Sequence, residues 1–262
     1  MATKYERIAD ALREEIRAGQ LKPGTKLPAE TTLADQYDTS VPTIRQATGV
    51  LVAEGLIEKR HGLGTFVRKE PTRVVRDNAR HQWEKDRARA SEAERLKTGA
   101  TERDTGLTIN DLVFEASYKQ VPATAELARA FDVPEGTTLL QRTYRTRYRE
   151  ERTPLNRSQS YLVLDMVAHN PDLLREDQEP WPGGTQNQLW TVGIELDRIV
   201  ETFHARPPTP EEVEELGLSA GVSVLLLRKV GIDTADRVVE VADVILPGDR
   251  TEMTFTTKLA RW

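Results

Sequence analysis

Few side chains in this sequence could do covalent or metal chemistry. The 262 residues include no cysteine and four histidines, so a disulfide, a thiolate nucleophile and a zinc–thiolate site are all excluded. Only His169 and His204 follow residue 100, and neither lies in a recognisable catalytic motif or in a cluster of acids suited to metal ligation. We therefore predict no catalytic residue, no metal and no cofactor.

The most informative hydrogen-bonding side chains lie in residues 27–67. The pattern there predicts two short helices separated by a tight turn, followed by two strands joined at a glycine-containing tip. Ser40 could cap the second helix, and Pro42 suits its first turn. A helix placed after such a turn, with a hairpin wing behind it, has the shape that enters the major groove of DNA. The outer face of this helix carries Thr43, Arg45 and Gln46.

The elements that position this helix can also be predicted. Tyr5–Ala18 is expected to form an amphipathic helix, with apolar residues at four-residue spacing and Gly19 beyond its last turn. Pro28 is expected to open the next helix. The apolar positions of these helices are Ile8, Leu12, Ile16, Leu33, Ala34, Ile44, Ala47 and Leu51.

Residues 4–69 resemble the GntR family of bacterial transcription regulators, which implies a winged helix-turn-helix. The resemblance is carried by Tyr5, Ile8, Leu12, Ile16, Gly19, Pro23-Gly24, Leu27-Pro28, Leu33-Ala34, Ser40, Thr43, Arg45-Gln46-Ala47, Leu51, Glu54-Gly55-Leu56-Ile57, Gly62 and Gly64-Thr65-Phe66-Val67. Many of these positions are apolar or glycine and therefore specify the fold.

The resemblance also implies which residues contact DNA: Tyr5, Ser40, Thr43, Arg45, Gln46, His61, Gly62 and Gly64. A guanidinium at position 45 could bind guanine O6 and N7 bidentately, whereas the hydroxyls suit phosphate. The two glycines would let the wing backbone approach the minor groove. The chain departs from the family at Val41, where relatives usually carry Arg, and at Thr31, where they often carry Arg or another long polar residue. We expect weaker affinity for DNA or a different operator.

Charge is distributed unevenly along the chain. Residues 1–69 hold 11 Lys and Arg against 9 Asp and Glu, a net charge of +2, and the remainder holds 26 against 33, a net charge of -7. A small basic module on an acidic body is compatible with DNA binding, although +2 is a weak electrostatic footprint. No apolar run suits a membrane span and the N-terminus lacks a signal-peptide core, so we expect a cytoplasmic protein with no membrane partner.

Residues 70–110 are predicted to connect two domains. The stretch 77–97 is dense in both charge signs and has few apolar residues, so a helix there would have little to bury. It is expected to be a partly helical connector or a solvated linker. Residues 105–110 are expected to be extended chain entering the second domain.

The region 111–262 is predicted to be an α+β domain, because strand-like and helix-like segments are segregated. The expected strands are 112–119, 138–148, 154–163, 196–205, 223–234, 237–246 and 251–259, and the expected helices are 124–131, 186–192 and 210–216.

This region resembles, from about residue 112 to 259, the UTRA effector-binding domain of the HutC subgroup, whose fold is like that of chorismate lyase. The carriers are Leu139-Leu140-Gln141-Arg142, Pro154, Ser158-Gln159-Ser160-Tyr161-Leu162, Pro208, Leu216, Leu218, Gly221, Val224–Arg228, Val239-Glu240 and Gly248-Asp249-Arg250. A helix-turn-strand unit also occurs twice, at 126–142 and 212–228, as an internal duplication typical of that fold.

The resemblance implies a small-molecule pocket formed by Arg142, Tyr144, Ser158, Ser160 and Glu240. Strand alternation supports part of this set, since 142 and 144 share one face, as do 158 and 160. Arg142 could hold an anionic group or form a structural ion pair. Relatives that bind sugar phosphates place Arg and Glu where this chain has Tyr144 and Ser158, which argues against that ligand.

The sequence thus predicts a winged helix-turn-helix at 1–69, a linker at 70–110 and an α+β effector-binding and dimerisation domain at 111–262. The expected function is that of a homodimeric repressor of transcription, bound to a palindromic double-stranded DNA operator and released by a small-molecule effector. The alternatives are a DNA-binding regulator without a ligand and a lyase-like enzyme. The enzyme has little support, because likeness of fold does not imply activity.

Overall fold

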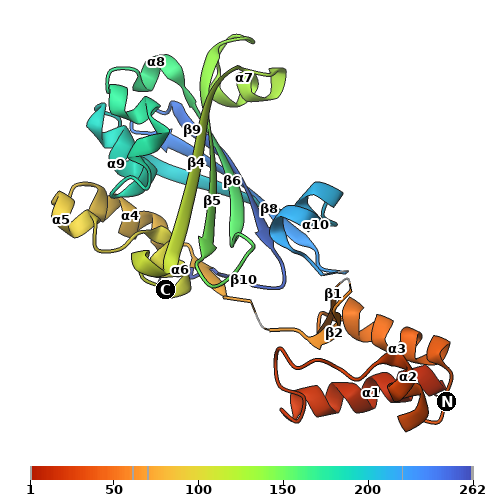
Figure 1. Cartoon of the computed structure of the whole chain (residues 1–262). Helices are drawn as coiled ribbons and strands as arrows, with labels where there is room; N and C mark the ends of the chain where they lie inside the picture. The colour runs from red at the N-terminus through yellow and green to blue at the C-terminus, as the bar shows by residue number, and fades with distance from the viewer. Residues whose placement is uncertain (1, 61, 70, 220, 261–262) are drawn as a thin grey trace. The chain divides into compact units, whose positions relative to one another are not determined.

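The computed structural model describes residues 2–60, 62–69, 71–219 and 221–260, which form two compact units. One unit comprises residues 1–71 and 207–223, and the other comprises 72–206 and 224–262. The predicted α+β class is confirmed. Figure 1 shows the chain with most of its helices and strands labelled.

The first unit consists of three helices and a two-stranded wing, joined by a further short helix from later in the chain. Its elements are α1 (Lys4–Arg17), α2 (Glu30–Gln36), α3 (Val41–Ala53), β1 (Ile57–Arg60), β2 (Gly64–Val67) and α10 (Pro210–Leu216). The second helix begins at Glu30, with Ala29 as its N-cap, and not at Pro28 as expected. The turn between α2 and α3 contains Asp38 at a positive φ of 45°.

A single apolar cluster holds the three helices and the wing together. It contains the residues whose spacing predicted amphipathic helices, together with one residue from each wing strand. The buried members are Ile8, Ala9, Leu12, Leu27, Leu33, Ala34, Ile44, Ala47, Leu51, Ile57 and Val67. Because α3 contributes three of them, its opposite face is left for solvent.

The second unit is built on a six-stranded antiparallel sheet in the order β4-β5-β6-β9-β8-β7. The strands are β4 (Leu112–Pro122), β5 (Thr138–Tyr148), β6 (Asn156–Val163), β7 (Leu196–Arg206), β8 (Val224–Asp233) and β9 (Val238–Pro247). The remaining elements are α4 (Arg80–Ala88), α5 (Glu92–Arg95), α6 (Ala100–Thr105), α7 (Ala125–Phe131), α8 (Leu164–Val167), α9 (Gly184–Thr191) and the short 3-10 turns η1 (Ile109–Asp111), η2 (Pro171–Leu174) and η3 (Glu176–Gln178).

Two expectations for this region were wrong. The strand predicted at 251–259 is only β10 (Thr251–Thr254), and it does not join the main sheet. It pairs in parallel with β3 (Val74–Asp77), a strand that the sequence pattern did not indicate. Residues 105–110 are not a continuous extended segment, since α6 ends at Thr105, Gly106 is left-handed and η1 begins at Ile109.

The internal repeat is visible in the order of the sheet. Along the chain, β4-α7-β5-β6 is followed by β7-α10-β8-β9, and in the sheet the two sets of strands are arranged in opposite order about the β6–β9 boundary. The caps correspond as well. Thr124 and Thr209 each cap a helix, and each helix ends at a left-handed residue, Asp132 with φ 54° and Gly217 with φ 59°.

Registers place the odd and even positions of each strand on opposite faces of the sheet. Arg142 pairs with Ser160, which pairs with Ala242, and Ala242 pairs with Lys229. Figure 1 shows α4, α5, α6 and α9 together beside the sheet. Hydrogen bonds tie this layer together, for example from Asn187 on α9 to the carbonyl of Ala88 on α4.

Candidate functional site

The exposed face of α3 carries the polar residues that the sequence singled out. Ser40 is the N-cap, but its side chain makes no capping bond to the helix backbone, and its hydroxyl lies 2.9 Å from that of Thr43. Arg45 and Gln46 are exposed, while the neighbouring Ile44 is buried in the core. The helix therefore presents hydroxyl, guanidinium and amide groups to solvent.

Arg45 is held by a carboxylate that sequence analysis missed. Its Nε lies 2.6 Å from Oε2 of Glu30 on α2, and Oε1 of the same carboxylate lies 3.6 Å from Nζ of Lys59 on the wing. The hydrogen bond from Arg45 lowers the pKa of Glu30. Glu30 thus joins α2, α3 and β1, a link between residues 15 and 29 positions apart that no local pattern reveals.

The wing needs glycine for two different reasons. Gly62 has a positive φ of 70°, a conformation that other residues rarely adopt. Gly64 has φ 118°, and a Cβ there would also lie 2.8 Å from Cε of Lys26. His61, the third residue predicted at this tip, lies outside the described residues. Tyr5 is partly buried and packs against the apolar cluster of the unit.

The second unit contains a cavity of about 280 Å³ on one face of its sheet. All five predicted pocket residues come from strands that place them on this face. Four of them line the cavity, namely Tyr144, Ser158, Ser160 and Glu240. The fifth, Arg142, is fully buried beside them.

Arg142 is enclosed by neutral and acidic partners. It donates to Oε1 of Gln188 at 2.6 Å and to Oγ of Ser160 at 2.7 Å, and it pairs with Oε1 of Glu240 at 3.2 Å. Ser160 also donates to that Glu240 oxygen at 2.7 Å, while Lys229 binds the other oxygen at 2.9 Å. Burial raises the pKa of Glu240, but Lys229 and Arg142 outweigh it and the net shift is downward.

A second carboxylate, Glu179, also lines the cavity and shares the Gln188 amide with Arg142. It accepts hydrogen bonds from the hydroxyls of Tyr118 and Tyr144 and from the amide of Gln188, and its other oxygen accepts from the backbone of Trp181 at 2.7 Å. Burial is the main reason why the pKa of Tyr144 lies well above its ordinary value, and burial with Glu179 raises the pKa of Tyr118 to about 12. Both phenols are therefore neutral donors.

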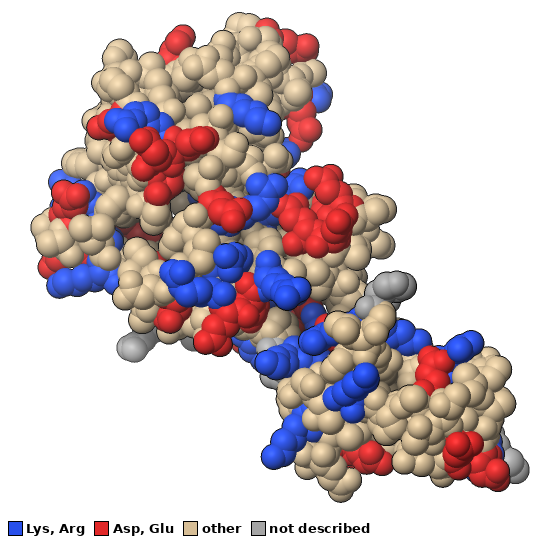
Figure 2. Space-filling model, viewed as in Figure 1, with Lys and Arg blue, Asp and Glu red and all other residues tan. Residues whose placement is uncertain are grey.

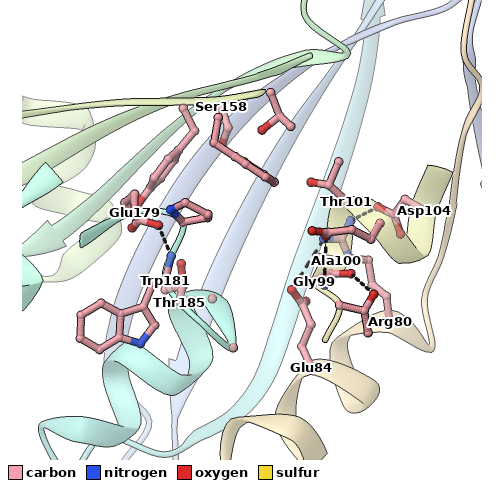
Figure 3. A pocket seen from close by; sticks show the side chains of 18 of the residues that line it. Arg80, Glu84, Gly99, Ala100, Thr101, Asp104, Ser158, Glu179, Trp181 and Thr185 are labelled. Carbon is pink, nitrogen blue, oxygen red and sulfur yellow. Dashed lines mark hydrogen bonds and ion pairs between the residues drawn. The ribbon is translucent and has the colours of Figure 1, made fainter. Parts of the chain in front are cut away.

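The opposite wall is formed by the segment predicted to be a linker. Figure 3 shows Arg80, Glu84, Gly99, Ala100, Thr101 and Asp104 facing Ser158, Glu179, Trp181 and Thr185 across the cavity. Behind this wall lies a buried ionic network. Arg80 pairs with Asp104 at 2.5 Å and with Glu84 at 3.7 Å. Sequence reasoning missed these residues because dense mixed charge was interpreted as a solvated surface.

His81 joins this network to the sheet. Its Nε2 lies 3.1 Å from Oε1 of Glu201 on β7, and its Nδ1 lies 3.6 Å from Glu84. Burial lowers the pKa of His81, but the contacts with Glu201 and Glu84 outweigh it, so the pKa is raised. Glu84 is held strongly ionised, with a pKa of about 2, because Arg80 and His81 outweigh its burial.

A metal-binding cluster and a membrane-spanning helix are both absent from the described residues. No group of three or more His, Cys, Asp or Glu side chains among them could hold a metal ion. Within the same residues, no helix is both long and apolar enough to cross a membrane.

The fold and sites define a class of protein. A winged helix-turn-helix with an exposed polar recognition helix, joined in one chain to an α+β unit with a polar cavity, is a DNA-binding regulator of transcription with a separate effector-type domain. Residues 4–67 match the bacterial regulatory proteins of the gntR family, and residues 116–252 match the UTRA domain. The chain belongs to the GntR family of transcription regulators, in the group that carries a UTRA domain.

Similar proteins extend over nearly the whole chain. An uncharacterised HTH-type transcriptional regulator of Streptomyces coelicolor is 28% identical, covering 98% of this chain and 94% of its own. The histidine utilization repressor of Klebsiella aerogenes is 28% identical, with 94% and 91% covered. The crystal structure of PhnF from Mycobacterium smegmatis has a TM-score of 0.52 at 19% identity, with 98% and 100% covered, and shows likeness of fold.

Proposed function

We propose that this regulator is a homodimeric repressor that binds a palindromic operator and is released when a small molecule occupies the cavity of the second unit. The observation that carries the proposal is the origin of the cavity wall. The wall comes from residues 74–104, and this stretch of chain begins seven residues after wing strand β2 ends at Val67. A ligand in the cavity would therefore contact the segment that leads out of the DNA-reading unit.

Within the first unit, Arg45 is proposed to bind guanine, with Gln46 beside it. Ser40 and Thr43 would bind phosphate at the helix N-terminus, and the wing tip at His61, Gly62 and Gly64 would approach the minor groove. Two such units bound to half-sites one helical turn apart require a twofold-symmetric operator. Two similar proteins, the histidine utilization repressor and the transcriptional repressor NagR of Bacillus subtilis, support repression over activation.

Release of the operator would be a shift in population between two arrangements of the protein, one that binds the operator and one that does not. A ligand changes the balance between two arrangements only by the difference in its affinity for them. Contacts with α4 and α6 that form in one arrangement supply that difference. Tyr144, Ser158, Ser160 and Glu240 are proposed as the sheet-side contacts of the ligand.

Selection of bound sequences from random duplex DNA tests the reading head. We expect the protein to enrich an inverted repeat and Arg45→Ala to lose that enrichment. Arg17→Ala is a matched control, because the Arg17 and Arg45 side chains are both 64% exposed but Arg17 lies on α1. Enrichment that survives in Arg45→Ala would contradict the assignment, and a single half-site would contradict the dimer.

Filling the cavity tests the effector role. Ser158→Trp is expected to retain operator binding and lose release by a metabolite fraction that acts on the parent protein. Gln159→Trp is the control, because this neighbouring residue lies on the opposite face of β6. Release by the fraction in both variants would contradict an effector site in this cavity.

A further inference from the structure

The charge lining the cavity is balanced before any ligand enters. Among the described residues, five Lys and Arg side chains and five Asp and Glu side chains line it, together with His81. An anion-binding cavity would instead show an excess of cations, because a buried anion needs compensation. The pairing of each charge shows whether any cation is available to a ligand.

Three of the cations already face carboxylates. Lys229 binds Glu240 at 2.9 Å, and Arg80 binds Asp104 at 2.5 Å. Arg76, which is 8% exposed, lies 3.6 Å from Glu201. The fully buried Arg142 shares Glu240 with Lys229 and donates to Ser160 and Gln188. Arg142 and Glu201 both lie outside the lining, so counting the two together leaves the numbers of cations and carboxylates equal.

The other two cations are held by the backbone. Arg87 donates to the carbonyls of Glu94 and Thr98, and Arg95 donates to the carbonyls of Ala90 and Pro182. In the count of lining charges, they are matched by two carboxylates whose hydrogen-bond partners are neutral. Glu102 accepts from the backbone of Gly99, and the partners of Glu179 are phenol, amide and backbone groups.

Some polar atoms of the residues that line the cavity lack a hydrogen-bond partner. The Nε atoms of Arg76 and Arg80 and Oδ1 of Asp104 are buried and have no hydrogen-bond partner in the part of the chain that the structure describes. These are two donors and one acceptor, and buried polar atoms of this kind favour a partner. The rings of Trp83, Phe114 and Trp181 provide apolar wall between the polar groups.

We propose that the effector is an uncharged, hydroxyl-bearing small molecule, and that the cavity rejects phosphorylated and other anionic relatives of it. Hydroxyl groups both donate and accept, so they can satisfy Arg Nε and Asp Oδ1 without adding charge. A zwitterionic ligand would gain less binding free energy than a neutral hydroxyl-bearing ligand, because the cations and anions of the lining are already bound to one another or to neutral and backbone groups. A cavity of about 280 Å³ suits a small ligand, near the lower end of the usual range for ligand pockets.

The inference rests on the proposed function only in taking this cavity as the effector site. It is tested without knowing the effector, by titrating the full-length protein calorimetrically with inorganic phosphate and with glucose 6-phosphate at constant ionic strength. The parent protein is expected to show no saturable binding of either anion. Glu179→Gln removes one cavity charge without removing a cation's partner, and it is expected to gain saturable binding of phosphate, with an affinity at least about tenfold above the weakest that the titration of the parent could have detected.

Glu115→Gln is the matched control, because it makes the same charge change on the opposite, exposed face of the sheet and should not gain phosphate binding. Glu240→Gln provides a second cavity variant in which Arg142 and Lys229 lose their shared partner. Circular dichroism establishes that each variant is folded.

Saturable binding of either anion by the parent protein, lost in Arg80→Gln, would overturn the inference. A folded Glu179→Gln and a folded Glu240→Gln that both ignore phosphate would overturn it too, since cavity charge would then not govern selection. Either result leaves the proposed function standing, because release of the operator by a cavity ligand is measured separately with Ser158→Trp.

Discussion

At the scale of single residues, strand alternation predicted the shared faces of the pocket but not the partners of its residues. Residues 142 and 144, and 158 and 160, lie on one face as the sequence indicated, and the register adds Glu240 to them. The enclosure of Arg142 could not be predicted, because Gln188 comes from a helix packed over the sheet. The sequence left open whether Arg142 binds a ligand or forms an ion pair, and in the structure Arg142 forms an ion pair with Glu240.

Arg142→Ala is expected to destabilise the protein by about 1–3 kcal/mol, because Gln188 loses its buried hydrogen-bond donor, whereas Glu240 keeps Lys229 as its ion-pair partner. Urea unfolding measures this change. Arg129→Ala, on the exposed surface of α7, is the control and should fall within about 0.5 kcal/mol of the parent. Equal effects in the two variants would show that the buried pair has no special role.

Glu30→Ala is expected to leave stability nearly unchanged and to alter DNA binding. Partly exposed ion pairs contribute on the order of 0–1 kcal/mol, so their loss is tolerated. Freeing Arg45 and Lys59 should strengthen binding to random duplex and reduce the preference for the selected operator, as measured by fluorescence anisotropy. Glu14→Ala makes the same charge change on α1 and should reproduce neither effect. If both variants behave alike, net charge and not the geometry of Arg45 sets the preference.

At the scale of elements, sequence patterns predicted those with apolar periodicity and missed those whose side chains are charged. The predicted helix at 210–216 and the predicted strand at 138–148 coincide with α10 and β5. By contrast, β3 and α4 carry Arg76 and Arg80, whose carboxylate partners Glu201 and Asp104 are more than 20 residues away. A sequence alone does not distinguish a charged residue that is buried against a distant partner from one that is exposed to solvent.

The network around His81 predicts a pH dependence of stability. The raised pKa means that the folded state binds its proton more tightly than the unfolded state, whose His pKa is near 6.5. His81 therefore stabilises the fold fully below pH 6.5 and loses that contribution as pH rises through the folded pKa. The facing charged groups are Glu84 on α4, Glu201 on β7 and Lys229 on β8.

Thermal unfolding between pH 6 and 8 measures this contribution. The parent should lose stability with rising pH in this window more steeply than His81→Gln, which has no proton to release. The carboxylates Glu84 and Glu201 have lowered pKa values, so their contributions are lost only at more acidic pH. Parallel curves for the parent and His81→Gln would contradict the raised pKa.

At the scale of the whole molecule, the net charge predicts how non-specific binding to DNA depends on salt. The chain has a net charge of -5, and Figure 2 shows both signs interspersed over its visible face. Non-specific affinity depends on neutralised phosphates and falls steeply with salt. Binding to random duplex is therefore expected to fall at least about tenfold between 50 and 200 mM salt and to be weak at the higher value. Anisotropy titrations with random and selected duplexes measure it, and tight binding to random duplex at 200 mM would contradict this view.

The mirrored order of the sheet has a consequence for the kinetics of folding. Within each half, strands pair through hairpins or across one short helix, so closure of these loops comes early. The β6–β9 seam is different, because it joins residues about 80 positions apart, such as Tyr161 and Val241. Non-local pairing of this kind is slow, so seam closure is expected to limit the folding rate. Ser160 and Glu240 lie on either side of the seam, and the cavity therefore exists only in chains that have completed this last step.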